Sequence, residues 1–230
     1  MGEAVLPGNP PIDIVLRRSA RARRISLRVS GLDGRVTLTL PRRVAESEAL
    51  GFARQKEDWI RRQLAGTPGA ETVGFGAVLP VEGRMRRVVP GAGRAVRLGA
   101  EVLEVPGAAG AVGARVEAFL KALARDRLVA ASDGYAARLG LGYGRISLRD
   151  TRSRWGSCSA AGDLMYSWRL ILAPPEVLAY VAAHEVAHRA RMDHSPAFWA
   201  VVAGLMPDHA RHRAWLRREG ASLHRWRFRA

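Results

Sequence analysis

The chain has 230 residues, a formal net charge of +16 from 37 Lys plus Arg against 21 Asp plus Glu, and a single cysteine. This length allows one large domain, or two small ones, with a real hydrophobic core. A single cysteine excludes an internal disulfide, so a cytoplasmic location is the default expectation. Neither a signal peptide nor a membrane span is expected, because residues 1–14 lack a basic start and the most apolar stretch, residues 170–183, is short and contains Glu176.

The positive charge is concentrated in two arginine-rich stretches. From Arg17 to Arg43 there are nine arginines and one acid, and from Arg211 to the end there are seven arginines and one acid, interleaved with aromatic residues. Arginine clamps phosphate and aromatic rings stack on bases, so these stretches suit nucleic acid or another polyanion. A basic surface with no specific partner explains the same composition, because charge alone does not define chemistry.

The N-terminal part of the sequence is predicted to be rich in strands. Residues 1–11, with three prolines and two glycines, predict a flexible tail. From Ile12 onwards, apolar residues alternate and predict strands up to Leu40, with the segment Gly31 to Gly34 as a hairpin turn. Residues 45–64 then carry apolar side chains at helical spacing.

A boundary is predicted near the middle of the chain. Short strands are expected in 77–105, so that 12–106 forms a basic, β-rich region with one helix. Residues 107–113 are only Gly, Ala or Val and predict a linker before a second domain at 114–230. Three glycines in this linker loosely resemble a dinucleotide-binding fingerprint, but no βαβ unit surrounds them.

The C-terminal half is predicted to combine helices with two strands. A long helix over 116–139 is followed by a strand from Ile146 and a second strand over 164–172. Two prolines then open a helix at about 175–190 that is apolar nearly all round, which is typical of a core helix. Further on, Ser195 resembles an N-cap and the proline after it the first residue of another helix.

The core helix carries a pattern typical of zinc hydrolases. His184 and His188 are four residues apart and so lie on one helix face, where both imidazoles can reach one metal ion. Glu185 is placed to take a proton from a metal-bound water. His194, on the turn before the next helix, can supply the third ligand and leave a fourth position open for catalysis.

Zinc is the expected cofactor because imidazole suits it, although manganese, nickel and iron remain open. Other residues compete with His194 for the third position, because zinc also accepts carboxylate oxygen; they are Asp193, Asp208, His209 and Glu219. Three histidines lie in later polar or basic stretches and are interpreted as surface residues; they are His209, His212 and His224.

Several motifs together resemble the YgjP-like metal-dependent hydrolases, usually classed as metallopeptidases and similar to the SprT and WLM zincins, some of which degrade proteins crosslinked to DNA. These motifs are Arg154-Trp-Gly-Ser-Cys158, Trp168-Arg-Leu-Ile-Leu-Ala-Pro174, His184-Glu-Val-Ala-His188, His194-Ser195 and Phe198-Trp199. The resemblance is specific over about residues 144–220 and looser before them. One position departs from it: the residue before Trp168 is often Asn in these proteins and is Ser167 here.

The resemblance implies an α+β fold with a zincin-like core, in which a small antiparallel sheet lies beside the active-site helix, preceded by the β-rich region. It also implies zinc held by His184, His188 and His194, with Glu185 as the catalytic base. Arg154 and Arg169 are candidates for stabilising the developing oxyanion, and either could instead pair with a buried acid.

Other side chains around these motifs have two interpretations. Three tryptophans have the size to wall a substrate pocket, although at least two of them are expected in the core; they are Trp155, Trp168 and Trp199. Cys158 is interpreted as a buried structural residue.

The leading functional hypothesis is a zinc metallopeptidase that acts on a peptide or protein. A nucleotide phosphoanhydride hydrolase (pyrophosphatase) is the first alternative, because the arginine excess suits a polyphosphate. The second is a nucleic-acid-binding protein or DNA-associated protease recruited by its basic surface. No membrane partner is expected, and the sequence does not indicate the oligomeric state.

Overall fold

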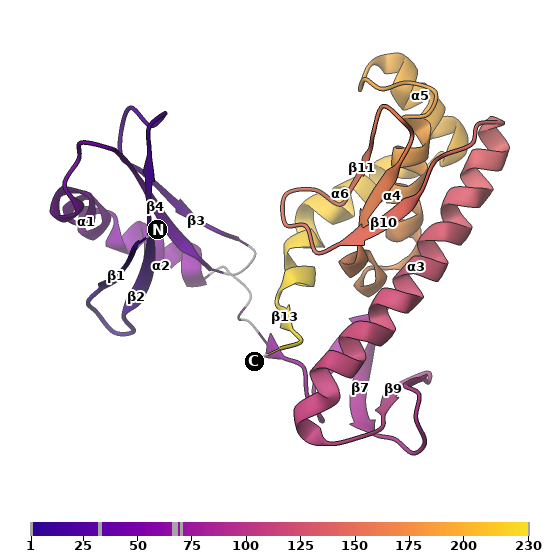
Figure 1. Cartoon of the computed structure of the whole chain (residues 1–230), viewed down its shortest axis with the longest axis horizontal. Helices are drawn as coiled ribbons and strands as arrows, with labels where there is room; N and C mark the ends of the chain where they lie inside the picture. Colours follow the sequence, from indigo (N-terminus) through magenta and orange to yellow (C-terminus); the bar gives the residue numbers. More distant parts are fainter. Residues whose placement is uncertain (1, 32–33, 66–68, 70, 230) are drawn as a thin grey trace. The chain divides into compact units, whose positions relative to one another are not determined.

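The first part of the chain folds as a four-stranded sheet with two helices (Figure 1). The structure, a computed structural model, describes residues 2–31, 34–65, 69 and 71–229. Two compact units are formed, residues 1–70 and 71–230. In the first, the strand order is β1-β2-β4-β3, with β1 at Gly2–Leu6, β2 at Ile12–Ser19, β3 at Ser26–Val29 and β4 at Val36–Pro41. The β2–β4 pair is parallel and the other two pairs are antiparallel.

One face of this sheet is buried against helices α1 (Glu46–Gln55) and α2 (Glu57–Ala65). Alternate residues of β2 and β4, such as Ile14 and Leu38, are buried, while the residues between them face outwards. The predicted alternation is therefore confirmed. Strands β3 and β4 are antiparallel neighbours, as the hairpin prediction requires, although Leu32 and Asp33 of the turn lie outside the described residues.

Two N-terminal predictions are wrong. Residues 2–6, expected to be part of a flexible tail, form β1, because Leu6 is buried in the core and the segment pairs along its length with β2. The helix expected over 45–64 is divided at Lys56 into α1 and α2. The residues around this break, 55–58, are all polar and are not part of the apolar core, so burial of apolar side chains does not favour a continuous helix at that turn.

The second unit contains a three-stranded and a four-stranded sheet. The first has the order β10-β12-β11, with β10 at Ile146–Arg149, β11 at Gly156–Cys158 and β12 at Leu164–Ser167. The second has the order β6-β7-β9-β8, with β6 at Val78–Val81, β7 at Arg84–Pro90, β8 at Arg97–Leu98 and β9 at Val102–Val105. A short parallel pair joins β5 (Glu71–Thr72) to β13 (Trp226–Arg227) near the C-terminus.

Four α-helices complete this unit: α3 at Val112–Leu139, α4 at Pro175–Ala187, α5 at Pro196–Leu205 and α6 at His209–Glu219. Three 3-10 helices lie at Ala109–Ala111, Trp168–Leu172 and Gly220–His224. The long helix α3 packs along α4 (Figure 1), and Gly140, in the left-handed conformation at φ 64°, ends it. Trp168, Tyr166 and Phe198 are among the largest fully buried side chains, so the core lies around α4.

The α+β fold class is confirmed, with four corrections inside the second unit. The two units divide at residues 70/71, and not at the expected linker 107–113. The reason is that the strands of 77–105 share one core with the later helices. The segment 107–113 leads directly into α3. The strand expected over 164–172 ends at Ser167; residues 168–172 are all buried in a 3-10 helix against α3, whereas a strand would turn alternate side chains to opposite faces. The small sheet is mixed, since β10 is parallel to β12. The core helix, expected over 175–190, ends at Ala187.

Among the described residues, no helix is both long enough and apolar enough to cross a membrane.

Candidate metal centre

Helix α4 presents two histidines on one side. Pro174 precedes the helix and Pro175 occupies its first turn, where a missing N–H costs nothing. His184 lies in the last turn and His188 is the C-cap, one helical repeat further along. The chain then turns back, and the Ser195 hydroxyl accepts a hydrogen bond from the Phe198 backbone N–H to begin α5. This turn returns His194 towards the histidines of α4.

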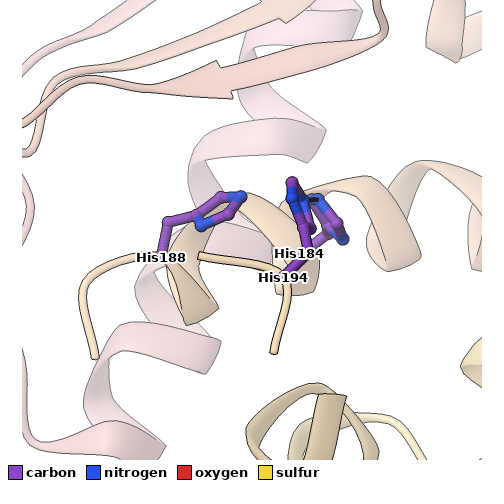
Figure 2. A group of neighbouring side chains, drawn as sticks. All are labelled: His184, His188 and His194. Atoms are coloured by element: carbon purple, nitrogen blue, oxygen red, sulfur yellow. Dashed lines mark hydrogen bonds between the residues drawn. The ribbon is translucent and has the colours of Figure 1, made fainter. Parts of the chain in front are cut away.

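The three imidazoles converge on one point. One ring nitrogen from each of His184, His188 and His194 lies within 4.8 Å of the other two. The Nε2 atoms of His184 and His194 are 3.2 Å apart, and Figure 2 shows the His188 ring turned towards this pair. Ligand nitrogens at about 2.0–2.1 Å from a tetrahedral zinc ion are about 3.3 Å apart. The spacing therefore fits three ligands of one metal ion.

The two histidines of α4 are also held in the protonation state that binds metal. Burial, followed by the neighbouring histidines, lowers the pKa of His184 to about 3, and burial lowers the pKa of His188. Neutral imidazole offers a free lone pair, whereas imidazolium does not. The Nδ1 atom of His188 lies 3.0 Å from the Arg191 carbonyl oxygen, so its N–H donates there and Nε2 keeps its lone pair. The donor set thus suits zinc or another divalent metal that accepts imidazole.

Glu185 follows His184 in the sequence, lines the same pocket and is buried, with only 5% of its surface exposed. Burial raises its pKa to about 8, against the opposing charge of Arg154. The carboxylate lies so close to the β11 backbone that a Cβ atom added to Gly156 would be 2.5 Å from Glu185 Oε1 and 2.6 Å from its Cγ. Gly156 is therefore required for the position of Glu185, a role that the motif search did not assign to it.

We expect Gly156→Ala to lower kcat at least about tenfold, because it displaces Glu185, the predicted general base, and moving such a group by about 1 Å can cost about a hundredfold. The three histidines are untouched, so metal content should stay at the wild-type level. Metal analysis and steady-state kinetics on the purified variant test this. Gly134→Ala is the matched control: its Cβ meets no atom within 4 Å, and in the middle of α3 it should stabilise the protein by up to about 1 kcal/mol. Unchanged kcat in Gly156→Ala would contradict the assigned role.

The Glu185 side of the site opens into a pocket of about 300 Å³. Its walls combine apolar, aromatic and basic side chains; they are Arg154, Trp155, Gly156, Tyr180, Val181, His184, Glu185, Arg213, Leu216 and Arg217. Arg213 and Arg217 lie one turn apart on α6, and neither was selected from the sequence. The guanidinium of Arg213 lies 4.5 Å from the Trp199 ring centroid, in a cation–π contact that positions it. The pocket is therefore suited to a substrate that carries negative charge.

The two candidate oxyanion residues are separated by the fold. Arg154 lines the pocket, whereas Arg169 does not and is buried against Asp150. Two of its nitrogens bond the Asp150 carboxylate at 2.7 and 3.0 Å, and a third bonds the Leu223 and Trp226 carbonyl oxygens. Arg169 thus fastens the C-terminal segment to the residue after β10 through an ion pair, although its partner Asp150 is exposed and is not the buried acid that was expected.

Arg169→Met should destabilise the protein by about 2 kcal/mol, mainly because it leaves two buried carbonyls without their donor, whereas water can solvate the exposed Asp150 carboxylate. Urea denaturation measures this loss, and kcat of the folded fraction should change little. A stable variant with a strongly reduced kcat would instead support the prediction that Arg169 stabilises the developing oxyanion.

The same pair has a defined pH dependence. Burial alone would raise the pKa of Asp150, but the hydrogen bonds and charge of Arg169 outweigh it and lower that pKa from 3.8. The ion pair therefore contributes its full stability above pH 3.8 and loses it as the pH falls further. The stability difference between wild type and Asp150→Asn should accordingly shrink on acidification below that value.

The competing ligands have other partners. Asp193 accepts from the Ser195 hydroxyl at 2.8 Å, Asp208 pairs with His212 at 2.9 Å, and Glu219 pairs with Arg218 at 2.7 Å. The His209 ring stacks on Trp199, with 5.8 Å between ring centroids. His212 is buried, which corrects its interpretation as a surface residue. It lies in the second turn of α6, where its ring contacts Asp208, the N-cap of that helix. His224 is half-buried and lies against Trp155.

The remaining motif residues divide between pocket and core. Trp155 lines the pocket, Trp199 flanks His184 and His194, and Trp168 is fully buried in the core. The Ser167 hydroxyl, at the position of the departure from the resemblance, is buried without a hydrogen-bond partner among the described residues. Cys158 is half-buried, and burial raises the pKa of its thiol, which disfavours a reactive thiolate.

A family model described as the YgjP-like metallopeptidase domain matches residues 23–219, which is most of the chain. No curated protein and no solved structure matches the sequence.

Proposed function

The chain belongs to the YgjP-like metallopeptidase family, whose name denotes a metal-dependent hydrolase, and from this premise we propose that it is a zinc-dependent peptidase. The observation that carries the proposal is that a buried carboxylate, Glu185, lines the same pocket as His184, one of three convergent imidazoles. A structural zinc site needs neither an adjacent unpaired carboxylate nor access from a pocket.

The metal would be held by His184, His188 and His194. A bound zinc ion supplies a Lewis acid that polarises the substrate carbonyl and lowers the pKa of water. Glu185 accepts the proton of the attacking water and then delivers it to the leaving amine, which is the general acid–base role of a buried carboxylate.

Two further pocket residues fit the charge that develops on the carbonyl oxygen. Arg154 lies near Glu185 and carries a fixed positive charge. Burial raises the pKa of Tyr180, so its hydroxyl stays protonated and can donate a hydrogen bond. Both donors line the same pocket as Glu185, where electrostatic stabilisation of an oxyanion would need them.

The experiment is a hydrolysis assay with metal removed and restored. The purified protein is incubated with an unfolded protein substrate after chelation, and then after addition of zinc, manganese, nickel or iron. We expect no cleavage without metal and restored cleavage with zinc. Cleavage that persists after chelation, with metal absent by elemental analysis, would contradict the proposal.

One observation favours a second candidate function. Three arginines line the pocket, namely Arg154, Arg213 and Arg217, and such a group also suits the phosphates of a nucleotide. The same machinery would then hydrolyse a phosphoanhydride bond. Assaying nucleoside triphosphates beside the unfolded protein, under identical metal conditions, separates the two reactions: phosphate or pyrophosphate release without peptide cleavage would replace the peptidase assignment.

A further inference from the structure

The N-terminal unit gathers two distant groups of arginines at one end of its sheet. Strands β2 and β4 are parallel and in register, so that Ser19 lies opposite Pro41 and both strands end together. The residues at this end and in the loops that leave it include seven arginines, which we call the arginine end; they are Arg17, Arg18, Arg21, Arg23, Arg24, Arg42 and Arg43. About twenty residues of sequence separate the two groups, and only the parallel pairing brings them together.

A direct contact joins the two groups. The Arg18 guanidinium donates to the backbone carbonyls of Arg42 at 3.1 Å and Val44 at 2.9 Å, and lies 3.3 Å from Glu46. The end of β2 is thereby tied to the segment that follows β4. The loop after β2 and the loop after β4 therefore present their arginines on the same side of the unit.

The charge at this end is not neutralised. All seven side chains are exposed, and Arg18 alone has an ion pair within the part of the chain that the structure describes. The other six make no side-chain hydrogen bond or ion pair to the described residues. A group of seven like charges with one acid paired to it repels itself, and a polyanion relieves that repulsion.

The surroundings are polar in the manner of a nucleic-acid interface. The outward face of the sheet carries hydroxyl side chains beside the arginines: Thr39 of β4 lies opposite both Arg17 and Ser26. Hydroxyls and guanidinium groups are the usual partners of phosphate oxygens. The two exposed large apolar residues described in this unit lie elsewhere, Val5 beside Asp13 at the other end of the sheet and Trp59 on α2.

This arrangement distinguishes between partners. A membrane surface that holds a protein stably takes apolar side chains as well as charge, and protein interfaces have an apolar centre. Neither is present at this end, whereas interfaces with nucleic acid are more polar and far more positive. We propose that the arginine end of the N-terminal unit binds the phosphate backbone of nucleic acid. This binding surface is distinct from the metal centre and does not depend on which bond that centre hydrolyses.

The test measures binding of the full-length protein to a fluorescently labelled DNA duplex and to a single-stranded RNA, as a function of salt. We expect the logarithm of the affinity to fall linearly with the logarithm of salt concentration, with a slope of about −0.9 for each phosphate contacted on the duplex. The double variant Arg24→Gln/Arg43→Gln takes one arginine from each loop. It should lose about tenfold in affinity and reduce the slope by about 2.

The matched control is Arg54→Gln/Arg62→Gln, which removes the same charge from exposed positions of α1 and α2, the helices on the opposite face. It should keep nearly full affinity. Arg24→Lys/Arg43→Lys keeps the charge and should recover the slope while recovering only part of the affinity, because lysine lacks the planar fork of arginine. Circular dichroism confirms that each variant is folded.

Three results would overturn the proposal: no binding to either nucleic acid at low salt, equal losses in the loop variant and the helix control, or binding to phosphatidylserine vesicles without binding to nucleic acid. Each of these leaves the hydrolase assignment untouched, because hydrolysis is measured separately on the same proteins.

Discussion

Replacing Glu185 with glutamine should lower kcat by about 10²–10⁴-fold, the range contributed by a positioned general acid–base group. Glutamine has nearly the same shape, so it fits the space beside Gly156 that the carboxylate occupies. It cannot accept the proton of the attacking water. Because the three histidines are retained, metal content should match the wild type, and steady-state kinetics with metal analysis will separate lost chemistry from lost metal.

The control for this change lies on the same helix. Glu176 is exposed in the first turn of α4, so Glu176→Gln makes the same substitution away from the imidazoles. It should keep kcat within about twofold and lose at most about 1 kcal/mol from its interaction with the helix N-terminus. A Glu185→Gln enzyme as active as this control would remove Glu185 from the reaction and leave its burial without a catalytic explanation.

Replacing His194 with alanine should abolish high-affinity metal binding. Mutating a residue that only hydrogen-bonds to a metal ligand lowers metal affinity by about 10–100-fold, so losing the ligand itself should lower metal affinity further. His194 is exposed and lies on a turn, so the metal-free variant should be as stable as the metal-free wild type to within about 0.5 kcal/mol. The effect on metal binding is therefore easier to distinguish from an effect on stability at His194 than at His188, which is buried.

Thermal unfolding with and without zinc provides the readout. A metal that binds only the folded state stabilises it by about 2.7 kcal/mol at a free concentration of a hundred times Kd. The wild type should therefore gain Tm with zinc, and His194→Ala should not. His209→Ala is the control, because His209 was a competing ligand and stacks on Trp199. If His209→Ala lost zinc and His194→Ala kept it, the ligand set would have to be revised.

The site was the most predictable part of the molecule. His184, Glu185 and His188 lie within five consecutive residues, and the helical repeat alone places the two histidines on one face. The start of α5 at Ser195 and the proline after it was also predicted correctly, because helix capping depends on a few neighbouring residues. His194 required only one short turn to reach the pair.

The errors occurred where distant segments determine the local conformation. Residues 2–6 look like a tail in isolation and form a strand only because β2 is available as a partner. Residues 168–172 have a run of apolar side chains that suits a strand or a buried helix, and packing on α3 selected the 3-10 helix. The unit boundary moved to residues 70/71 for the same reason, since the core of the second unit recruits the strands of 77–105.

The sequence by itself determined the family, the convergent histidines and the adjacent carboxylate, because these depend on spacing within one helix and its following turn. Only the tertiary structure decided the roles of the arginines. It buried Arg169 in an ion pair, placed Arg213 and Arg217 in the pocket, and brought the arginines after β2 beside those after β4. The physical reason is that a charged side chain takes its function from what packs around it, and those neighbours come from parts of the chain far away in sequence.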